Sequence, residues 1–232
     1  MKNINWYRPT NWLYPFFVVF IVDLAAVYLG EESFRQVTKP FLMTFLILYF
    51  IRETAFKQSA LKKFIVLALI FSWLGDVLLL FETRDENFFI FGLVAFLVAH
   101  VFYILFFIKI IMEENQKRRF WILIPVMVYY VVLISVLSPT LEDMKWPVRV
   151  YGIVISYMLI KALQTGWIKN RMAALYLISG AILFVISDSI LALNKFYQSF
   201  EYAGLFIMVT YGLAQLLITV GAVRYISNIS KK

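Results

Sequence analysis

The sequence of 232 residues contains no cysteine, a single histidine and few charged residues. The lack of cysteine excludes disulfide bonds, thiolate metal sites and cysteine nucleophiles. Charged residues make up 16% of the chain and hydrophobic residues 62%, against about 25% and about 45–50% in soluble globular domains. This balance excludes a soluble enzyme, a disordered chain and a nucleic-acid-binding domain as the main interpretations.

Several catalytic motifs are also missing. The sequence has no G-x-S-x-G nucleophile elbow, no H-E-x-x-H zinc motif, and neither a Walker A nor a G-x-G-x-x-G phosphate loop. One histidine with scattered acids is a poor match to the spacing of zinc ligands. We therefore expect no cofactor and no metal.

Long apolar runs are what the sequence does contain. A membrane-spanning helix needs about 20 apolar residues, and the pattern predicts an all-α polytopic membrane protein with eight transmembrane helices in one integral membrane domain, residues 1–232. The predicted spans are about 12–30, 38–51, 63–81, 88–111, 120–138, 147–165, 172–193 and 202–225. The second span is short and opens with Lys39-Pro40. Proline is acceptable at this position, because it costs little in the first turn of a helix.

The distribution of basic residues predicts the orientation. Most of the 22 Lys and Arg residues fall at the two chain ends and in the loops after the second, fourth and sixth spans. By the positive-inside rule, we expect both termini on the cytoplasmic side of the cell membrane. The net charge of +8 then reflects topology and attraction to anionic lipid, with no nucleic-acid partner.

A weak internal repeat relates the two halves of the chain. Gly75-Asp76 aligns with Ser187-Asp188, and Gly92-Leu93 with Gly204-Leu205, at one constant offset of 112 residues. The repeat suggests a 4+4 duplication, with parallel copies related by an axis along the membrane normal.

Two acids inside predicted spans are the strongest candidates for function. An ionisable residue in a bilayer costs about 2.5–3.5 kcal/mol or more on insertion scales and usually faces the bundle interior. Asp76 and Asp188 both lie near the outer ends of their spans, at a matched depth of about 7–8 Å. Such a pair supplies one protonated and one ionised carboxyl, which suits cleavage through an oxocarbenium-like state, as in glycosidic or enol-ether bonds.

Other polar residues in the spans each have a structural alternative. Tyr211 and Gln215 can serve as interhelical hydrogen bonders, and His100 as a buried structural histidine. Lys39 can extend to the interface as an anchor, and Asp23 can hydrogen-bond within the bundle.

Taken together, the ordered set of motifs resembles the YhhN-like lysoplasmalogenase family over residues 38–220, nearly the whole chain. The residues that carry the resemblance are Lys39-Pro40, Gly75-Asp76, Gly92-Leu93, His100-x-x-Tyr103, Tyr151, Gly180-Ala181, Phe184, Ser187-Asp188, Thr210-Tyr211 and Ala214-Gln215.

The resemblance implies an eight-span hydrolase that cleaves the vinyl ether bond of lysoplasmalogen. The products would be a fatty aldehyde and glycerophosphoethanolamine or glycerophosphocholine. Asp76 and Asp188 would be the acid/base pair, with the individual roles open, and Lys39 would hold the lipid phosphate. The remaining candidates would orient water, the glycerol hydroxyl or the headgroup: His100, Tyr103, Tyr151, Asn194, Tyr211 and Gln215.

Other interpretations stay open at this point. The substrate can be another lysolipid or ether lipid, and the oligomeric state is open. A small lipid or solute transporter fits paired repeats with buried charges. A metal-dependent lipid hydrolase would use Asp23, Asp76, His100 and Asp188, and a non-catalytic lipid-binding scaffold would tolerate loss of both central acids.

Overall fold

The computed structural model describes residues 11–117 and 119–229, and over those residues its regular elements are all helices. The long helices are α1 (Tyr14–Leu29), α2 (Glu32–Glu53), α3 (Lys62–Leu79), α4 (Asn87–Glu113), α5 (Leu123–Leu137), α6 (Lys145–Gln164), α7 (Arg171–Ala192) and α8 (Ala203–Ile229). Short 3₁₀ turns are η1 (Asn11–Leu13), η2 (Phe120–Ile122), η3 (Ser138–Thr140), η4 (Glu142–Met144) and η5 (Thr165–Trp167), and η6 (Leu193–Tyr197) is π-helical.

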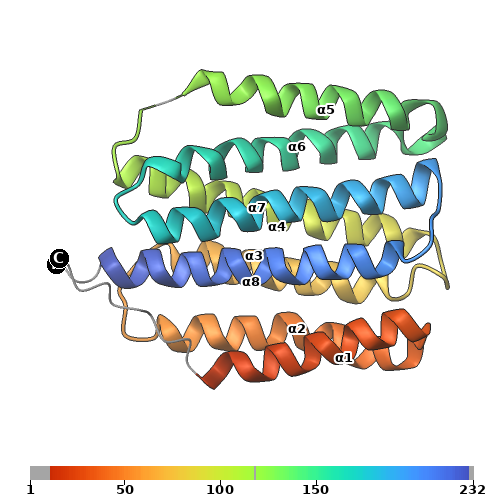
Figure 1. Ribbon diagram of the computed structural model, residues 1–232, viewed down its shortest axis with the longest axis horizontal. Helices are drawn as coiled ribbons and strands as arrows, with labels where there is room; N and C mark the ends of the chain where they lie inside the picture. The colour runs from red at the N-terminus through yellow and green to blue at the C-terminus, as the bar shows by residue number, and fades with distance from the viewer. Residues whose placement is uncertain (1–10, 118, 230–232) are drawn as a thin grey trace.

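The long helices lie side by side along the longest axis of the molecule, and helices consecutive in the chain run in opposite directions (Figure 1). The most extensive packing is between α7 and α8 and between α3 and α4. α1 and α5 lie at opposite edges of the bundle, and α1 begins at the same end as α8 finishes (Figure 1). The segments joining α1 to α2, α3 to α4 and α7 to α8 therefore gather at the other end.

Six helices of the described chain are long and apolar enough to cross a membrane: α1, α4, α5, α6, α7 and α8, with their adjoining turns. These helices indicate an integral membrane protein and confirm the predicted all-α class. α2 and α3 are not among the six. α3 has only 18 residues, and they include Lys62, Lys63 and Asp76. The first turns of α2 contain Glu32, Arg35 and Lys39, which lower its hydropathy. The charges at Lys2, Arg8, Arg118, Lys231 and Lys232, which entered the predicted orientation, lie outside the described residues.

α2 differs from the predicted second span. It begins at Glu32, six residues before the expected start at 38, and Pro40 lies inside the helix instead of in its first turn. Proline removes one backbone donor and normally breaks or kinks a helix. Here the helix continues because tertiary packing, with Leu42 and Leu46 fully buried, outweighs this local cost.

The added N-terminal turns of α2 bring further polar side chains into the bundle. Arg35 Nη1 donates to Glu32 Oε1 at 3.1 Å, and Thr38 Oγ1 donates to Asp23 Oδ1 of α1 at 2.6 Å. Arg35 and Lys39 now belong to one helix, four residues apart, and so share a face.

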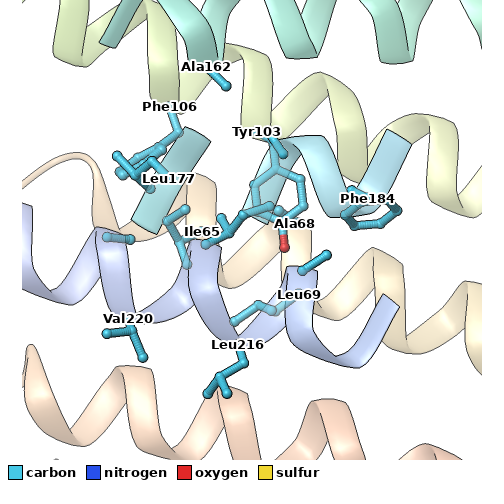
Figure 2. Packing of buried hydrophobic residues seen from close by; sticks show 14 of the residues in the cluster. Ile65, Ala68, Leu69, Tyr103, Phe106, Ala162, Leu177, Phe184, Leu216 and Val220 are labelled. Carbon is cyan, nitrogen blue, oxygen red and sulfur yellow. The ribbon is translucent and has the colours of Figure 1, made fainter. Parts of the chain in front are cut away.

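The interior is built from close helix packing. Figure 2 shows labelled side chains of α3, α4, α6, α7 and α8 meeting there, among them Leu69, Phe106 and Phe184. Small residues let the backbones approach, as is usual between helices in a membrane. A Cβ added to Gly180 of α7 would lie 2.9 Å from the carbonyl oxygen of Ala214 on α8. Gly180 therefore sets the spacing of the α7–α8 pair.

Candidate functional site

A cavity of about 220 Å³ opens among helix ends from both halves of the chain. Its lining includes Lys39 from α2, Asp76 from α3, Tyr151 from α6, Asp188 from α7 and Tyr211 from α8. The cavity lies toward the end of the bundle away from the start of α1 and the finish of α8, since it also includes the last turn of α3 and the first turn of α8. Both predicted acids thus face one space.

Asp76 lies on α3 and is held by two partners from other helices. Its Oδ2 accepts a hydrogen bond from the Tyr211 hydroxyl at 2.6 Å. Its Oδ1 is 3.7 Å from the Lys39 Nζ, and both side chains are more than nine-tenths buried. Lys39 therefore supplies a cationic counter-charge to this carboxyl inside the bundle.

The position of Asp76 depends on the glycine before it. A Cβ on Gly75 would lie 2.6 Å from the ring of Phe96 on α4, and a Cβ on Gly92 would lie 3.4 Å from the carbonyl oxygen of Gly75. These two glycines let α3 and α4 approach closely. Gly75 thus packs directly against α4, and Asp76, the next residue along the helix, faces the cavity.

Asp188 lies on α7 and has a different environment. Its Oδ2 accepts a hydrogen bond from the Tyr151 hydroxyl at 2.5 Å. The same oxygen is 3.8 Å from His100 Nε2 of α4, too far for a hydrogen bond. The Asp188 side chain is 14% exposed, so the cavity reaches it.

The ring of His100 is fully buried and fixed in orientation. Its Nδ1 lies 2.6 Å from the Phe96 carbonyl oxygen, and since a carbonyl only accepts, Nδ1 carries the proton. Among the described residues, Nε2 has no hydrogen-bond partner. The ring edge also meets Phe184 and Tyr151, with centroid distances of 4.7 and 5.3 Å. His100 thus directs an unpaired nitrogen toward Asp188.

Tyr103 and Gln215 lie behind the cavity and do not line it. The Tyr103 hydroxyl donates to Gln215 Oε1 at 2.5 Å, and Gln215 Nε2 donates to the Tyr211 hydroxyl oxygen at 3.4 Å. Since Tyr211 in turn donates to Asp76, these residues form one chain of hydrogen bonds from α4 through α8 to α3. They hold Tyr211 in place.

Asn194 lines the cavity from the π-helical turn η6. Its Oδ1 accepts a hydrogen bond from the backbone N–H of Phe200 at 3.3 Å. This bond ties the end of α7 to the segment that leads into α8. Asn194 thus shapes the mouth of the cavity.

The two carboxyl environments are related by the sequence offset of 112 residues. Lys39 and Asp76 are in contact, and so are Tyr151 and Asp188, which lie 112 residues further along. Tyr103 and Gln215, also 112 residues apart, hydrogen-bond to each other. Asp76 therefore contacts α2 of its own half and α8 of the other half. Asp188 is hydrogen-bonded to α6 of its own half and lies near His100 on α4 of the other half.

Sequence reasoning missed three charged residues of the cavity: Glu32, Arg35 and Glu82. The first two were assigned to an outer loop because the second span was started at residue 38. The spacing of four residues between Arg35 and Lys39 was the available signal, because it places both side chains on one face of a helix. This inference requires that the helix extend from Pro40 toward the N-terminus as far as Arg35.

The described residues, 11–117 and 119–229, contain no cluster of three His, Asp or Glu side chains suited to a metal ion. What they do contain is a pair of carboxyls in one cavity, one beside an ammonium group and one beside a neutral imidazole nitrogen. A difference in surroundings of this kind is what an acid/base pair requires, since it favours the protonated form of one carboxyl and the ionised form of the other.

Fold and site together define a helical integral membrane protein in which two carboxyls, Asp76 and Asp188, line one internal cavity. The family model of the YhhN family matches residues 34–222, and the chain belongs to this family, which confirms the resemblance seen in the sequence. No solved structure matches the chain.

Curated relatives carry one common name. Human lysoplasmalogenase TMEM86B is 34% identical over 157 residues, which cover 68% of this chain and 62% of the relative. Human lysoplasmalogenase TMEM86A is 32% identical over 166 residues, covering 68% and 65%. A lysoplasmalogenase of Mycobacterium tuberculosis is 29% identical over 163 residues, covering 69% and 60%. The matched region spans less than two thirds of the length of each of these relatives.

Proposed function

We propose that this chain is a membrane hydrolase that cleaves the vinyl ether bond of lysoplasmalogen. The products are a fatty aldehyde and glycerophosphoethanolamine or glycerophosphocholine. The observation that carries the proposal is the pair Asp76 and Asp188 on one cavity, each held by a tyrosine hydroxyl and each with a different basic neighbour. The names of the relatives support the substrate class.

The first step is protonation of the vinyl ether at carbon. Asp188 suits the acid role, because an ionised carboxylate facing the lone pair of His100 Nε2 would be repelled, whereas a protonated carboxyl is not. Its proton forms a new C–H bond with the β carbon as the double bond opens. The ether oxygen stabilises the resulting oxocarbenium ion.

The second step is addition of water. Asp76, beside the Lys39 ammonium, accepts a proton from water as the oxygen bonds to the α carbon, which gives a hemiacetal. Asp76 then returns that proton to the glycerol oxygen as the C–O bond breaks. The hemiacetal hydroxyl passes its proton to Asp188, so the aldehyde leaves and both carboxyls regain their starting states.

The remaining candidates position these two groups. Tyr151 and Tyr211 donate to the carboxyls and also line the cavity, where their rings contact the substrate. His100 acts through Asp188. Tyr103 and Gln215 act through Tyr211, and Asn194 contacts the headgroup at the mouth.

Aldehyde release from lysoplasmenylethanolamine by the purified protein in detergent tests this function. In D₂O, we expect one deuterium at carbon 2 of the aldehyde per turnover, because the mechanism protonates that carbon from an exchangeable group. Unlabelled aldehyde incubated in D₂O with the protein controls for later exchange, and an assay with chelator examines metal dependence. Aldehyde without deuterium would contradict carbon protonation. The absence of any product from a folded preparation would end the vinyl-ether assignment and direct the search to other lysolipids and to transport.

We further propose that all eight long helices cross the cell membrane as a 4+4 repeat with cytoplasmic termini. α2 and α3 have 22 and 18 residues, or about 33 and 27 Å, against a hydrocarbon core of about 30 Å. α2 packs against α1 and α8, and α3 packs against α4 and α8. The charges of Lys39 and Asp76 face one another between α2 and α3. The contacts repeated at 112 residues support the duplication.

Cysteine labelling tests this topology on the cysteine-free background. Gln58 and Asp85 are exposed at opposite ends of α3. In intact cells, an impermeant thiol reagent is expected to label Asp85→Cys and to label Gln58→Cys only after permeabilisation. Equal labelling of both positions in intact cells would contradict α3 as a span.

A further inference from the structure

The mouth of the cavity carries charged side chains that the acid/base mechanism does not use. Glu32 and Arg35 line it from the start of α2, and Glu82 from the segment after α3. Glu82 forms an ion pair of 3.4 Å with Lys195 of η6, across the mouth. The Arg35 side chain is 19% exposed, whereas that of Glu32 is 67% exposed. Arg35 is therefore the more buried of these two side chains and, like Lys39, a basic residue of the cavity lining.

The hydrogen bonds of Arg35 leave one buried donor without a partner. Nη1 donates to the two carboxylate oxygens of Glu32 at 3.1 and 3.4 Å. Nε is buried and, among the described residues, has no hydrogen-bond partner. Buried charged donors are rarely left unpaired, and the guanidinium edge that contains Nε matches two oxygens of a phosphate. An anion that enters the cavity would satisfy this donor.

The register of α2 places this donor at a suitable distance from the reacting groups. Arg35 lies one turn before Lys39 on the same face, about 6 Å along the helix, and Lys39 contacts Asp76. In a lysophospholipid, the three-carbon glycerol separates the ether oxygen from the phosphate by a similar span. A phosphate at Arg35 thus leaves the ether bond beside the carboxyl pair.

We propose that Arg35 binds the substrate phosphate and makes the site selective for lysophospholipids over alkenylglycerols without a headgroup. This proposal rests on the proposed function for the identity of the lipid. Glu32 and Glu82 at the same mouth favour headgroups that also carry an ammonium group, as ethanolamine and choline do. Arg35 then fixes the register of the lipid, while the carboxyl pair performs the reaction.

Kinetics with two substrates test this role. Arg35→Gln is expected to raise KM for lysoplasmenylethanolamine by about ten- to a hundredfold, because a charged hydrogen bond to phosphate is lost, with kcat nearly unchanged. For 1-alkenylglycerol, KM should not change. Arg84→Gln, an exposed arginine at the same end of the bundle that does not line the cavity, is the matched control. Equal increases of KM for both substrates, or no increase for either, would overturn the proposal.

Binding without turnover separates this proposal from the reaction. The probe is a 1-alkyl lysophosphatidylethanolamine, whose saturated ether cannot follow the vinyl ether path, compared with the matching 1-alkylglycerol. Arg35→Gln should weaken binding of the phospholipid probe alone, by about tenfold or more. Arg35→Lys keeps the positive charge but loses the paired donors of the guanidinium, so its affinity for that probe should lie between those of the wild type and Arg35→Gln. If the wild type releases no aldehyde but shows this phosphate-dependent difference, the reaction assignment fails and the role of Arg35 stands. Equal loss of both probes would overturn that role.

Discussion

Asp188→Asn is expected to lower kcat for aldehyde release by about 10²–10⁴-fold, the usual contribution of a general acid or base. The amide keeps the shape of the side chain and still accepts the Tyr151 hydrogen bond, but it cannot give a proton to carbon. Folding should survive, since a neutral amide replaces a neutral carboxyl of nearly the same shape and keeps its hydrogen bond. Initial rates at saturating lysoplasmenylethanolamine, with thermal unfolding in the same detergent, measure both effects.

The same substitution at Asp85 is the matched control. Asp85 is exposed near the end of α3, and its Oδ1 accepts a hydrogen bond from the Asn87 backbone N–H at 2.9 Å, which asparagine can also accept. Asp85→Asn should therefore keep wild-type turnover. A near-normal rate for Asp188→Asn, with the fold intact, would remove Asp188 from the acid role.

The sequence was sufficient to predict the helices and the central acids. Each of the eight predicted spans overlaps one long helix, because apolar runs bounded by charge have few alternatives in a chain this hydrophobic. Asp76 and Asp188 were predicted to lie at matched depth, and both line one cavity. Charged residues are so costly inside a bilayer that two of them stand out without any structure.

Tertiary packing decided what the sequence left open. Pro40 indicated the start of a helix, yet the helix extends past it to Glu32, and only that extension places Arg35 at the cavity. The partners of residues behind the cavity also depend on tertiary packing. His100 and Tyr103 share nearly the same face of α4 and neither lines the cavity, but His100 approaches Asp188 and Tyr103 donates to Gln215. Spacing along one helix does not specify these partners on other helices.

Lys39→Gln is expected to lower kcat by about 10²–10³-fold, within the usual contribution of a general base, with a smaller effect on KM. Lys39 lies beside Asp76, and removing one partner of a buried ion pair leaves the other charge uncompensated. Without the ammonium, Asp76 is expected to keep a proton and so to lose its capacity to accept one from water. The rates for lysoplasmenylethanolamine and 1-alkenylglycerol should fall by the same factor, because Lys39 acts on Asp76 and not on the lipid headgroup.

A double-mutant cycle with Asp76→Asn separates this role of Lys39 from phosphate binding, the role that the sequence first suggested. If Lys39 acts as the counter-charge of Asp76, then Lys39→Gln should change the residual rate of Asp76→Asn little, since no carboxylate remains to be compensated. If Lys39 binds phosphate instead, its loss should raise KM for the phospholipid alone and should do so equally in both backgrounds. That second pattern would contradict the counter-charge assignment and would transfer the phosphate contact from Arg35 to Lys39, one turn deeper in the cavity.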